Sequence, residues 1–205
     1  KNNFVNNLSL FEETLYFLNT YGSLYSIDLS TSRISWFINL NRSLDLNPSN
    51  LFNGNEIIGL KNKLIVSSDQ FTYVINRNNG FITHKKNYVS IIKPILIDDY
   101  IFSISKNNLL IAMNLSTGEI IYSYDINQKI ANFLNTKKHK VEFKKIMLLN
   151  NKIFIFLKNS YVIKLNLRGE IESLLKLSSK LNTDPIVINS SLLYLNKKNK
   201  LKIFN

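Results

Sequence analysis

The residues that could do acid–base or metal chemistry are few and widely spaced. His84 and His139 are the only histidines among 205 residues, and neither has a carboxylate or a second histidine at metal-ligand spacing. His84 is expected to pack within a repeat, and His139 to lie in a solvated loop. Paired carboxylates occur at Glu12-Glu13 and Asp98-Asp99, in equivalent places between apolar stretches. A general acid and base need two carboxylates that converge on one cleft, so this equivalence favours hairpin turns.

Other catalytic motifs are missing from the sequence. It contains no Gly-x-Ser-x-Gly, no glycine loop of the phosphate-binding kind and no cysteine. Disulfides, thiolate metal sites and cysteine nucleophiles are therefore excluded from these residues. The sequence predicts a protein that is not an enzyme and that binds no metal and no cofactor.

The net charge of +12 would suit a polyanionic partner, but its distribution argues against one. The lysines are scattered among asparagines and isoleucines, which favours an ordinary solvated surface. One basic stretch, 137–145 (KKHKVEFKK), could meet an anionic lipid or an acidic protein patch, although a solvated loop is favoured. The aromatic residues lie on predicted strands rather than on stacking platforms, so no nucleic-acid partner is expected. No apolar run reaches the roughly 18–20 residues of a membrane span.

An internal repeat is the main signal in the sequence. Five segments begin with an apolar strand and end on Asp or Asn: 15–28, 64–76, 101–114, 153–166 and 192–205. Four of these ends are followed by turn-forming residues. An Asp or Asn side chain can accept a backbone N–H two residues on, and glycine supplies the positive φ that closes a hairpin. Ser32 replaces that glycine in the first repeat, which predicts a different or mildly strained turn.

Further strands before and after each segment complete a four-stranded antiparallel blade, the unit of a β-propeller. The repeats begin near residues 8, 57, 94, 146 and 185, and the last lacks its fourth strand. The first strands are apolar at nearly every position, which is typical of sheets covered on both faces. Only 127–135 has any helical character, of two turns at most. The sequence thus predicts an all-β chain, with residues 1–205 forming one propeller segment whose start has been lost.

Two stretches resemble the PQQ-like propeller repeat: 24–36 (LYSIDLSTSRISW) and 110–122 (LIAMNLSTGEIIY). The resemblance implies a ring of about seven or eight blades, of which about four and a half lie here. It also implies that a tryptophan docks against the next blade. The equivalent residues here are Trp36, His84, Tyr122 and Ser173, so looser packing between blades is expected. Quinoproteins of this family pair their cofactor with a calcium site and vicinal cysteines, and the cysteines are absent.

The end of the chain, with 182–187 (NTDPIV), 192–195 (LLYL) and 201–205 (LKIFN), resembles the BamB family of periplasmic lipoproteins. That resemblance implies a non-catalytic, protein-binding scaffold in outer-membrane β-barrel assembly, at the periplasmic face of the outer membrane. Its partners would be a BamA-like barrel-assembly protein and nascent outer-membrane proteins, bound by β-augmentation. Membrane association would come only from a lipid anchor upstream. The alternatives are a fragment of a PQQ-dependent quinoprotein oxidoreductase and a ligand-binding propeller.

A long insertion between the first two repeats, 41–54, is the candidate partner-binding loop. Its candidate residues are Arg42, Leu44, Asp45, Leu46, Leu51 and Phe52. Exposed Leu and Phe beside Arg would suit a protein contact. Equally, these apolar residues could tuck under the loop. Both readings stay open at the level of sequence.

Overall fold

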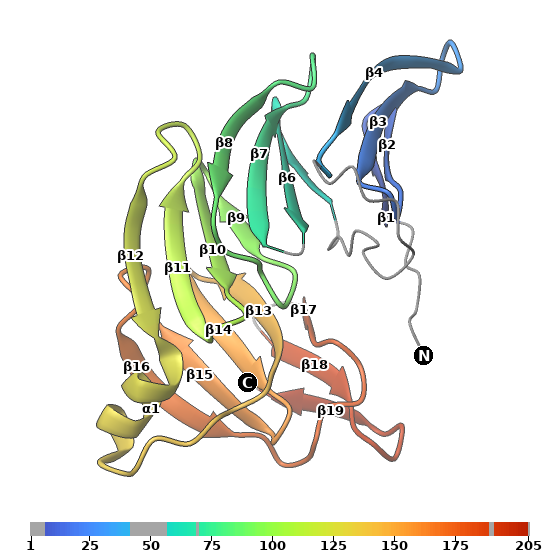
Figure 1. Ribbon diagram of the computed structural model, residues 1–205. Coiled ribbons are helices and arrows are strands. Elements are labelled where there is room, and N and C mark those ends of the chain that lie inside the picture. Colours follow the sequence, from blue (N-terminus) through green and yellow to red (C-terminus); the bar gives the residue numbers. More distant parts are fainter. Residues whose placement is uncertain (1–6, 42–56, 69, 189–190, 205) are drawn as a thin grey trace. The chain divides into compact units, whose positions relative to one another are not determined.

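The computed structural model describes residues 7–41, 57–68, 70–188 and 191–204. In these ranges the chain forms five antiparallel sheets, each made of strands consecutive in the sequence, together with one helix (Figure 1). Four sheets have four strands, and the last has three. The prediction of an all-β chain of four-stranded antiparallel blades is therefore confirmed.

The sheets are numbered here in chain order. Sheet 1 contains β1 (Asn7–Phe11), β2 (Thr14–Leu18), β3 (Ser23–Asp28) and β4 (Arg33–Asn39). Sheet 2 contains β5 (Ile58–Leu60), β6 (Lys63–Ser68), β7 (Phe71–Asn76) and β8 (Ile82–Lys86). Sheet 3 contains β9 (Ile95–Ile97), β10 (Tyr100–Ile104), β11 (Leu109–Asn114) and β12 (Ile120–Asp125), and α1 (Ile126–Leu134) follows it. Sheet 4 contains β13 (Phe143–Leu149), β14 (Lys152–Leu157), β15 (Tyr161–Leu165) and β16 (Ile171–Lys176), and sheet 5 contains β17 (Ile186–Ile188), β18 (Ser191–Leu195) and β19 (Leu201–Phe204).

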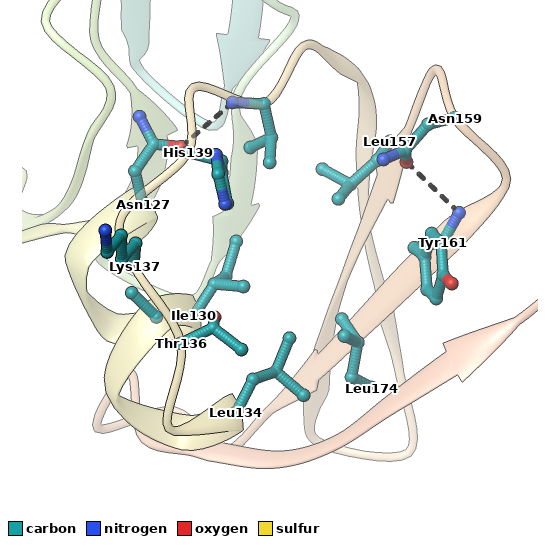
Figure 2. Close-up of a pocket in the computed structure, with 12 residues that line it drawn as sticks. Asn127, Ile130, Leu134, Thr136, Lys137, His139, Leu157, Asn159, Tyr161 and Leu174 are labelled. Atoms are coloured by element: carbon teal, nitrogen blue, oxygen red, sulfur yellow. Dashed lines mark hydrogen bonds between the residues drawn. The ribbon is translucent and has the colours of Figure 1, made fainter.

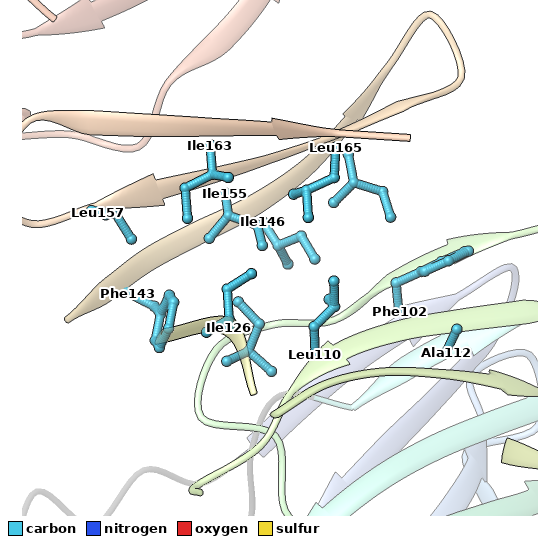
Figure 3. Close-up of a cluster of buried hydrophobic side chains, with 12 residues drawn as sticks. Phe102, Leu110, Ala112, Ile126, Phe143, Ile146, Ile155, Leu157, Ile163 and Leu165 are labelled. Atoms are coloured by element: carbon cyan, nitrogen blue, oxygen red, sulfur yellow. The ribbon is translucent and has the colours of Figure 1, made fainter. Parts of the chain in front are cut away.

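The chain divides into two compact units, described separately below. The first unit comprises residues 1–91 and the turn Leu115–Gly118, and so holds sheets 1 and 2. Its core joins buried residues of both sheets, among them Tyr16, Leu24, Leu64 and Tyr73. The second unit comprises residues 92–114 and 119–205. Its larger core joins sheets 3 and 4 with the start of α1 (Figure 3), and a smaller one joins sheets 4 and 5.

The hairpins close as the sequence predicts. The Asp28 carboxylate accepts the backbone N–H of Ser30 at 2.8 Å, and the Asn76 amide oxygen accepts that of Asn78 at 2.9 Å. Ser32 has φ 55°, a left-handed conformation that is mildly strained for a residue with a Cβ. Between the first two strands of sheets 1 and 3, Glu12 and Asp98 also have positive φ, which confirms that these carboxylates belong to turns.

A ring on the fourth strand of one sheet contacts the turn of the next. Trp36 Nε1 donates a hydrogen bond to the Arg77 carbonyl at 2.8 Å, and His84 Nε2 lies 2.9 Å from the Ser116 carbonyl. In the second unit, Tyr122 Oη donates to the Leu167 carbonyl at 3.0 Å. His84 and Tyr122 thus make the same kind of hydrogen bond to a following turn as Trp36, while the expectation of looser packing between blades stays a prediction.

Helix α1 is longer than the sequence indicates. Its nine residues make about two and a half turns, where at most two were expected. The Asp125 carboxylate caps the first turn by accepting the Gln128 N–H at 3.1 Å. Asn135 ends the helix in a left-handed conformation, with φ 52°. These two caps stabilise a helix whose length alone would leave it marginal.

Candidate functional site

The predicted partner-binding loop lies outside the described residues. This applies to all its candidate residues: Arg42, Leu44, Asp45, Leu46, Leu51 and Phe52. The loop stays a prediction from sequence.

The two histidines belong to different units, His84 to the first and His139 to the second. His84 bonds to a backbone carbonyl, which can only accept, so Nε2 must carry the proton. His139 is exposed and lines a pocket described below. Within the described ranges, no three His, Cys, Asp or Glu side chains form a group that could hold a metal ion.

One face of sheet 1 carries apolar side chains on all four strands. Strand pairing places them in two rows, one from Leu8 through Phe17 and Tyr25 to Phe37, the other from Leu10 through Leu15 and Ile27 to Ile34. We call these eight residues the first-sheet face. Along the first row the rings of Phe17, Tyr25 and Phe37 stack, with centroids 6.1 and 5.9 Å apart.

The first-sheet face is exposed on its two outer strands and partly buried on its two inner strands. Leu8, Leu10, Ile34 and Phe37, on its two outer strands, are between 57% and 64% exposed. Sequence alone predicted sheets covered on both faces. Within the described residues the outer strands of this face are exposed, so its cover stays a prediction.

The same face of sheet 2 is covered. Pairing makes Leu64 and Ile75 the equivalents of Leu15 and Ile27, and Val66 and Tyr73 those of Phe17 and Tyr25. The four sheet 2 residues are at most 3% exposed, because sheet 1 packs against them. The first-sheet face therefore has the composition of a covered face, although its outer strands are exposed among the described residues.

The second unit contains a pocket of about 370 Å³ between α1 and sheet 4 (Figure 2). One wall is a single stripe of the helix, formed by Asn127, Ile130, Ala131 and Leu134. These residues are spaced i, i+3, i+4 and i+7, so they lie on one helical face. The loop after the helix adds Thr136, Lys137, His139 and Val141, and sheet 4 adds Leu157, Asn159, Tyr161 and Leu174. We call this hollow the α1 pocket.

Several contacts fix the walls of the α1 pocket. The buried Asn127 accepts the Val141 N–H at 3.2 Å and so ties the loop to the helix. Lys129 Nζ donates to the Gly169 carbonyl at 3.0 Å, which fastens α1 to a turn of sheet 4. Ala131 and Leu157 are buried, whereas Leu134 is 44% exposed at the rim. The pocket thus has a firm apolar floor and opens at the surface.

The rim of the α1 pocket is basic. Lys137 and His139 line it and form no ion pair within the described ranges. The carboxylates that flank the helix and loop in the sequence are already engaged: Asp125 pairs with Lys138, and Glu142 with Lys158 at 2.9 Å. The hydrogen bond from Lys138 and the N–H of Gln128 hold the pKa of the Asp125 carboxyl below its usual range. It is therefore ionised and neutralises Lys138, leaving Lys137 unbalanced.

Sequence reasoning missed both surfaces. The helical stripe was present in the sequence, as was the Asp125 cap, but the segment is too short to show a clear helical period. The first-sheet face could not be distinguished from covered faces, because its residues are of the same types.

Comparison with known proteins gives the fold but no family. No protein-family model matches the sequence, and no curated protein matches it either. Among solved structures, the chain is similar to BamB from Moraxella catarrhalis, with 11% identity, a TM-score of 0.52, and coverage of 96% of this chain and 70% of that one. It is also similar to the computationally designed Ika8 protein, with 10% identity, a TM-score of 0.68, and 96% and 57% coverage.

A third similar structure is the β-propeller domain of Cps50 (Swd1) from Myceliophteria thermophila. Its identity is 10% and its TM-score 0.66, with 100% of this chain and 65% of that one covered. Together these similarities establish the β-propeller fold of the chain. Within the described part, no helix is long and apolar enough to cross a membrane.

Proposed function

We propose that the protein is a non-catalytic, protein-binding scaffold that acts as a BamB-like accessory subunit in outer-membrane β-barrel assembly. The observation that carries protein binding is the first-sheet face, an apolar surface that spans four strands. Four of its side chains are more than half exposed, and contiguous apolar surface of this kind is typical of interaction sites. Because sheet 1 buries the equivalent face of sheet 2, an apolar sheet face is the kind of surface that fits here.

The more specific proposal of barrel assembly rests on two likenesses. One is the fold shared with BamB from Moraxella catarrhalis, and the other is the sequence of the last repeat. In that repeat Thr183 Oγ1 accepts the Leu195 N–H at 3.1 Å, so the segment before β17 is held against the end of β18. The proposed location is the periplasmic face of the outer membrane, with a BamA-like protein as partner.

Nascent outer-membrane proteins are the second proposed class of partner. Among the described residues, strand β4 is hydrogen-bonded to β3 on one side only, and it lies at the edge of sheet 1. An extended segment could add to that edge as a further strand, with main-chain hydrogen bonds giving affinity. Its side chains would then extend the first-sheet face.

A pull-down from detergent-solubilised envelopes tests this proposal. The wild type is compared with an Ile34→Glu, Phe37→Glu double variant and with the control double variant Ile120→Glu, Ile121→Glu. All four side chains are exposed, so neither variant should unfold. A barrel-assembly protein should co-purify with the wild type and the control, and should be lost from the Ile34, Phe37 variant.

Two outcomes would count against the proposal. If the Ile34, Phe37 variant retains the partner, the first-sheet face is not the contact. If no barrel-assembly protein co-purifies with any form, the role in barrel assembly is wrong. A third variant, Arg42→Glu with Phe52→Ser, tests the predicted loop independently, since loss of the partner there would assign the contact to the loop.

A further inference from the structure

The α1 pocket has the properties of a site for one apolar group. Its floor includes Ala131 and Leu157, which are 3% and 2% exposed, and Ile130 and Leu174 pack against the main core of the second unit. At about 370 Å³, its volume lies at the low end of the roughly 300–1,000 Å³ of ligand sites. That space suits an aromatic or branched side chain better than a long acyl chain.

An exposed apolar residue of the pocket lining adds to the apolar surface that an occupant can cover. Leu134 lines the pocket and is 44% exposed. Burying apolar surface yields about 25 cal/mol per Å². An occupant that fills the pocket and covers Leu134 would therefore gain free energy without rearranging the fold.

The positive charge at the rim favours an anionic group next to the apolar side chain of the occupant. Lys137 lines the pocket without an ion partner in the described ranges, and the imidazole of His139 lies on the same loop. Because Asp125 and Glu142 already pair with other lysines, the rim offers a site for a carboxylate from outside. Complementary charge of this kind confers specificity more than affinity.

Polar groups around the rim can orient a peptide that crosses the opening of the pocket. Thr136 and Asn159 are exposed beside the apolar floor, and a few placed polar groups are what orient an occupant in such sites. The pocket opens on the surface of the second unit, between a helix and a sheet (Figure 2). A chain can therefore cross the opening while one side chain points inward.

We infer that the α1 pocket binds a partner peptide through one large apolar side chain inserted between α1 and sheet 4, with an adjacent carboxylate paired to Lys137. The inference rests on the proposed protein-binding function and adds a second contact, distinct from the first-sheet face. The recognised sequence is an aromatic or large aliphatic residue next to Asp or Glu.

The test uses the ¹⁵N-labelled chain and three synthetic peptides. The acidic probe is acetyl-Gly-Asp-Phe-Asp-Gly-amide, and its matched forms carry Asn or Lys in place of both Asp residues. The acidic peptide should shift the amide signals of Ala131, Leu134 and Leu174. It should bind about fivefold more tightly than the Asn form, as expected for roughly 1 kcal/mol from an exposed ion pair. That difference should vanish in about 1 M salt.

Two pocket variants and one control separate the contribution of the ion pair from that of the apolar contact. Lys137→Glu should abolish the preference for the acidic peptide, and Lys140→Glu, which makes the same charge change outside the pocket lining, should keep most of it. Ala131→Leu fills the pocket with a good helix former and should lower affinity for all three peptides at least about fivefold. Circular dichroism verifies that each variant is folded.

Several results would overturn the inference. These are equal binding of the acidic and Asn peptides, undiminished binding to Ala131→Leu, or signal shifts confined to residues away from the pocket. If 3-phenylpropanoate binds more tightly than the acidic peptide, the site takes small carboxylates instead of peptides. If the peptides do not bind the pocket but a barrel-assembly protein still co-purifies from envelopes, only this inference is refuted. If the peptides bind the pocket but no barrel-assembly protein co-purifies, only the role in barrel assembly is refuted.

Discussion

Trp36, His84 and Tyr122 each present a different ring to a backbone carbonyl in a following turn. An indole N–H, an imidazole N–H and a phenol O–H are all donors of similar reach, so the contact survives a change of residue. Burial raises the pKa of the Tyr122 hydroxyl, with a smaller contribution from Tyr124. The phenol therefore stays protonated and keeps donating across the neutral range.

The glycine beside each ring shows how tight this contact is. A Cβ on Gly118 would lie 2.5 Å from His84 Nδ1, and one on Gly80 would lie 2.6 Å from the Trp36 ring. Gly118 also has φ +70°, which disfavours any residue with a Cβ.

A double-mutant cycle at Gly118 and His84 tests this packing. Gly118→Ala should destabilise the protein by about 2 kcal/mol or more, because the strained φ and the clash add. In a His84→Ala background the same change should cost only about 1 kcal/mol, since only the φ strain remains. Urea unfolding followed by circular dichroism measures both values. Equal costs in the two backgrounds would show that Gly118 and His84 do not pack as described.

Sequence reasoning identified these positions but not what they do. The alignment of repeats placed His84 where a tryptophan is expected, and that was enough to predict packing. The hydrogen bond to Ser116 was not predictable, because it depends on where the next turn lies in space. Likewise, His139 was placed correctly in an exposed loop, while its position on the pocket rim required the fold of α1.

At the scale of the element, α1 depends on its caps more than on its length. Asp125 bonds to the Gln128 N–H and pairs with Lys138, and both interactions favour the ionised carboxyl, so its pKa is lowered. Because the folded pKa lies below the unfolded one, the stabilisation is present above the ordinary Asp pKa of about 3.9. It is lost as the pH falls through the folded value.

Two Asp125 variants separate capping from charge. Asp125→Ala should destabilise the second unit by about 0.5–2 kcal/mol through loss of the cap, whereas Asp125→Asn keeps a capping oxygen and should cost less. The difference in urea midpoint between wild type and Asp125→Asn should shrink as the pH is lowered from about 7 to about 3. A difference that stays constant or grows at low pH would mean that the carboxylate charge does not stabilise the helix.

The sheets were the most predictable elements, because their strands and turns repeat. Asp28, Asn76 and their equivalents mark each turn in the sequence, and the structure uses them as side-chain acceptors. The exposure of Ile34 and Phe37 among the described residues was not predictable, because residues of the same types line the buried face of sheet 2.

At the scale of the whole molecule, repeats that contact mainly their neighbours should lose stability locally. The single tryptophan, Trp36, reports on the first unit, while circular dichroism reports on both units. Ile155 is fully buried in the core of the second unit.

Ile155→Ala should therefore lower the circular-dichroism midpoint in urea by more than it lowers the Trp36 fluorescence midpoint. The expected loss is about 2–5 kcal/mol in the second unit. The control Ile121→Ala, at a position 51% exposed, should change neither midpoint by more than about 0.5 kcal/mol. Equal shifts of both signals by Ile155→Ala would show that the two units unfold as one.

The proposed function requires that a partner at the membrane covers the first-sheet face, which is exposed among the described residues. Since the chain has no cysteine, a single introduced thiol can report on this directly. Phe37→Cys replaces a residue that is 64% exposed, and Lys106→Cys supplies an exposed control in a turn of sheet 3.

The decisive measurement is the rate of maleimide labelling of Phe37→Cys, in the purified protein and in native envelopes. We predict rapid labelling of the purified protein and at least about tenfold slower labelling in envelopes, with Lys106→Cys labelled rapidly in both. Equal rates for Phe37→Cys in the two preparations would contradict binding through this face. Slow labelling of the purified protein would mean that the face is already covered, and would contradict the account just as directly.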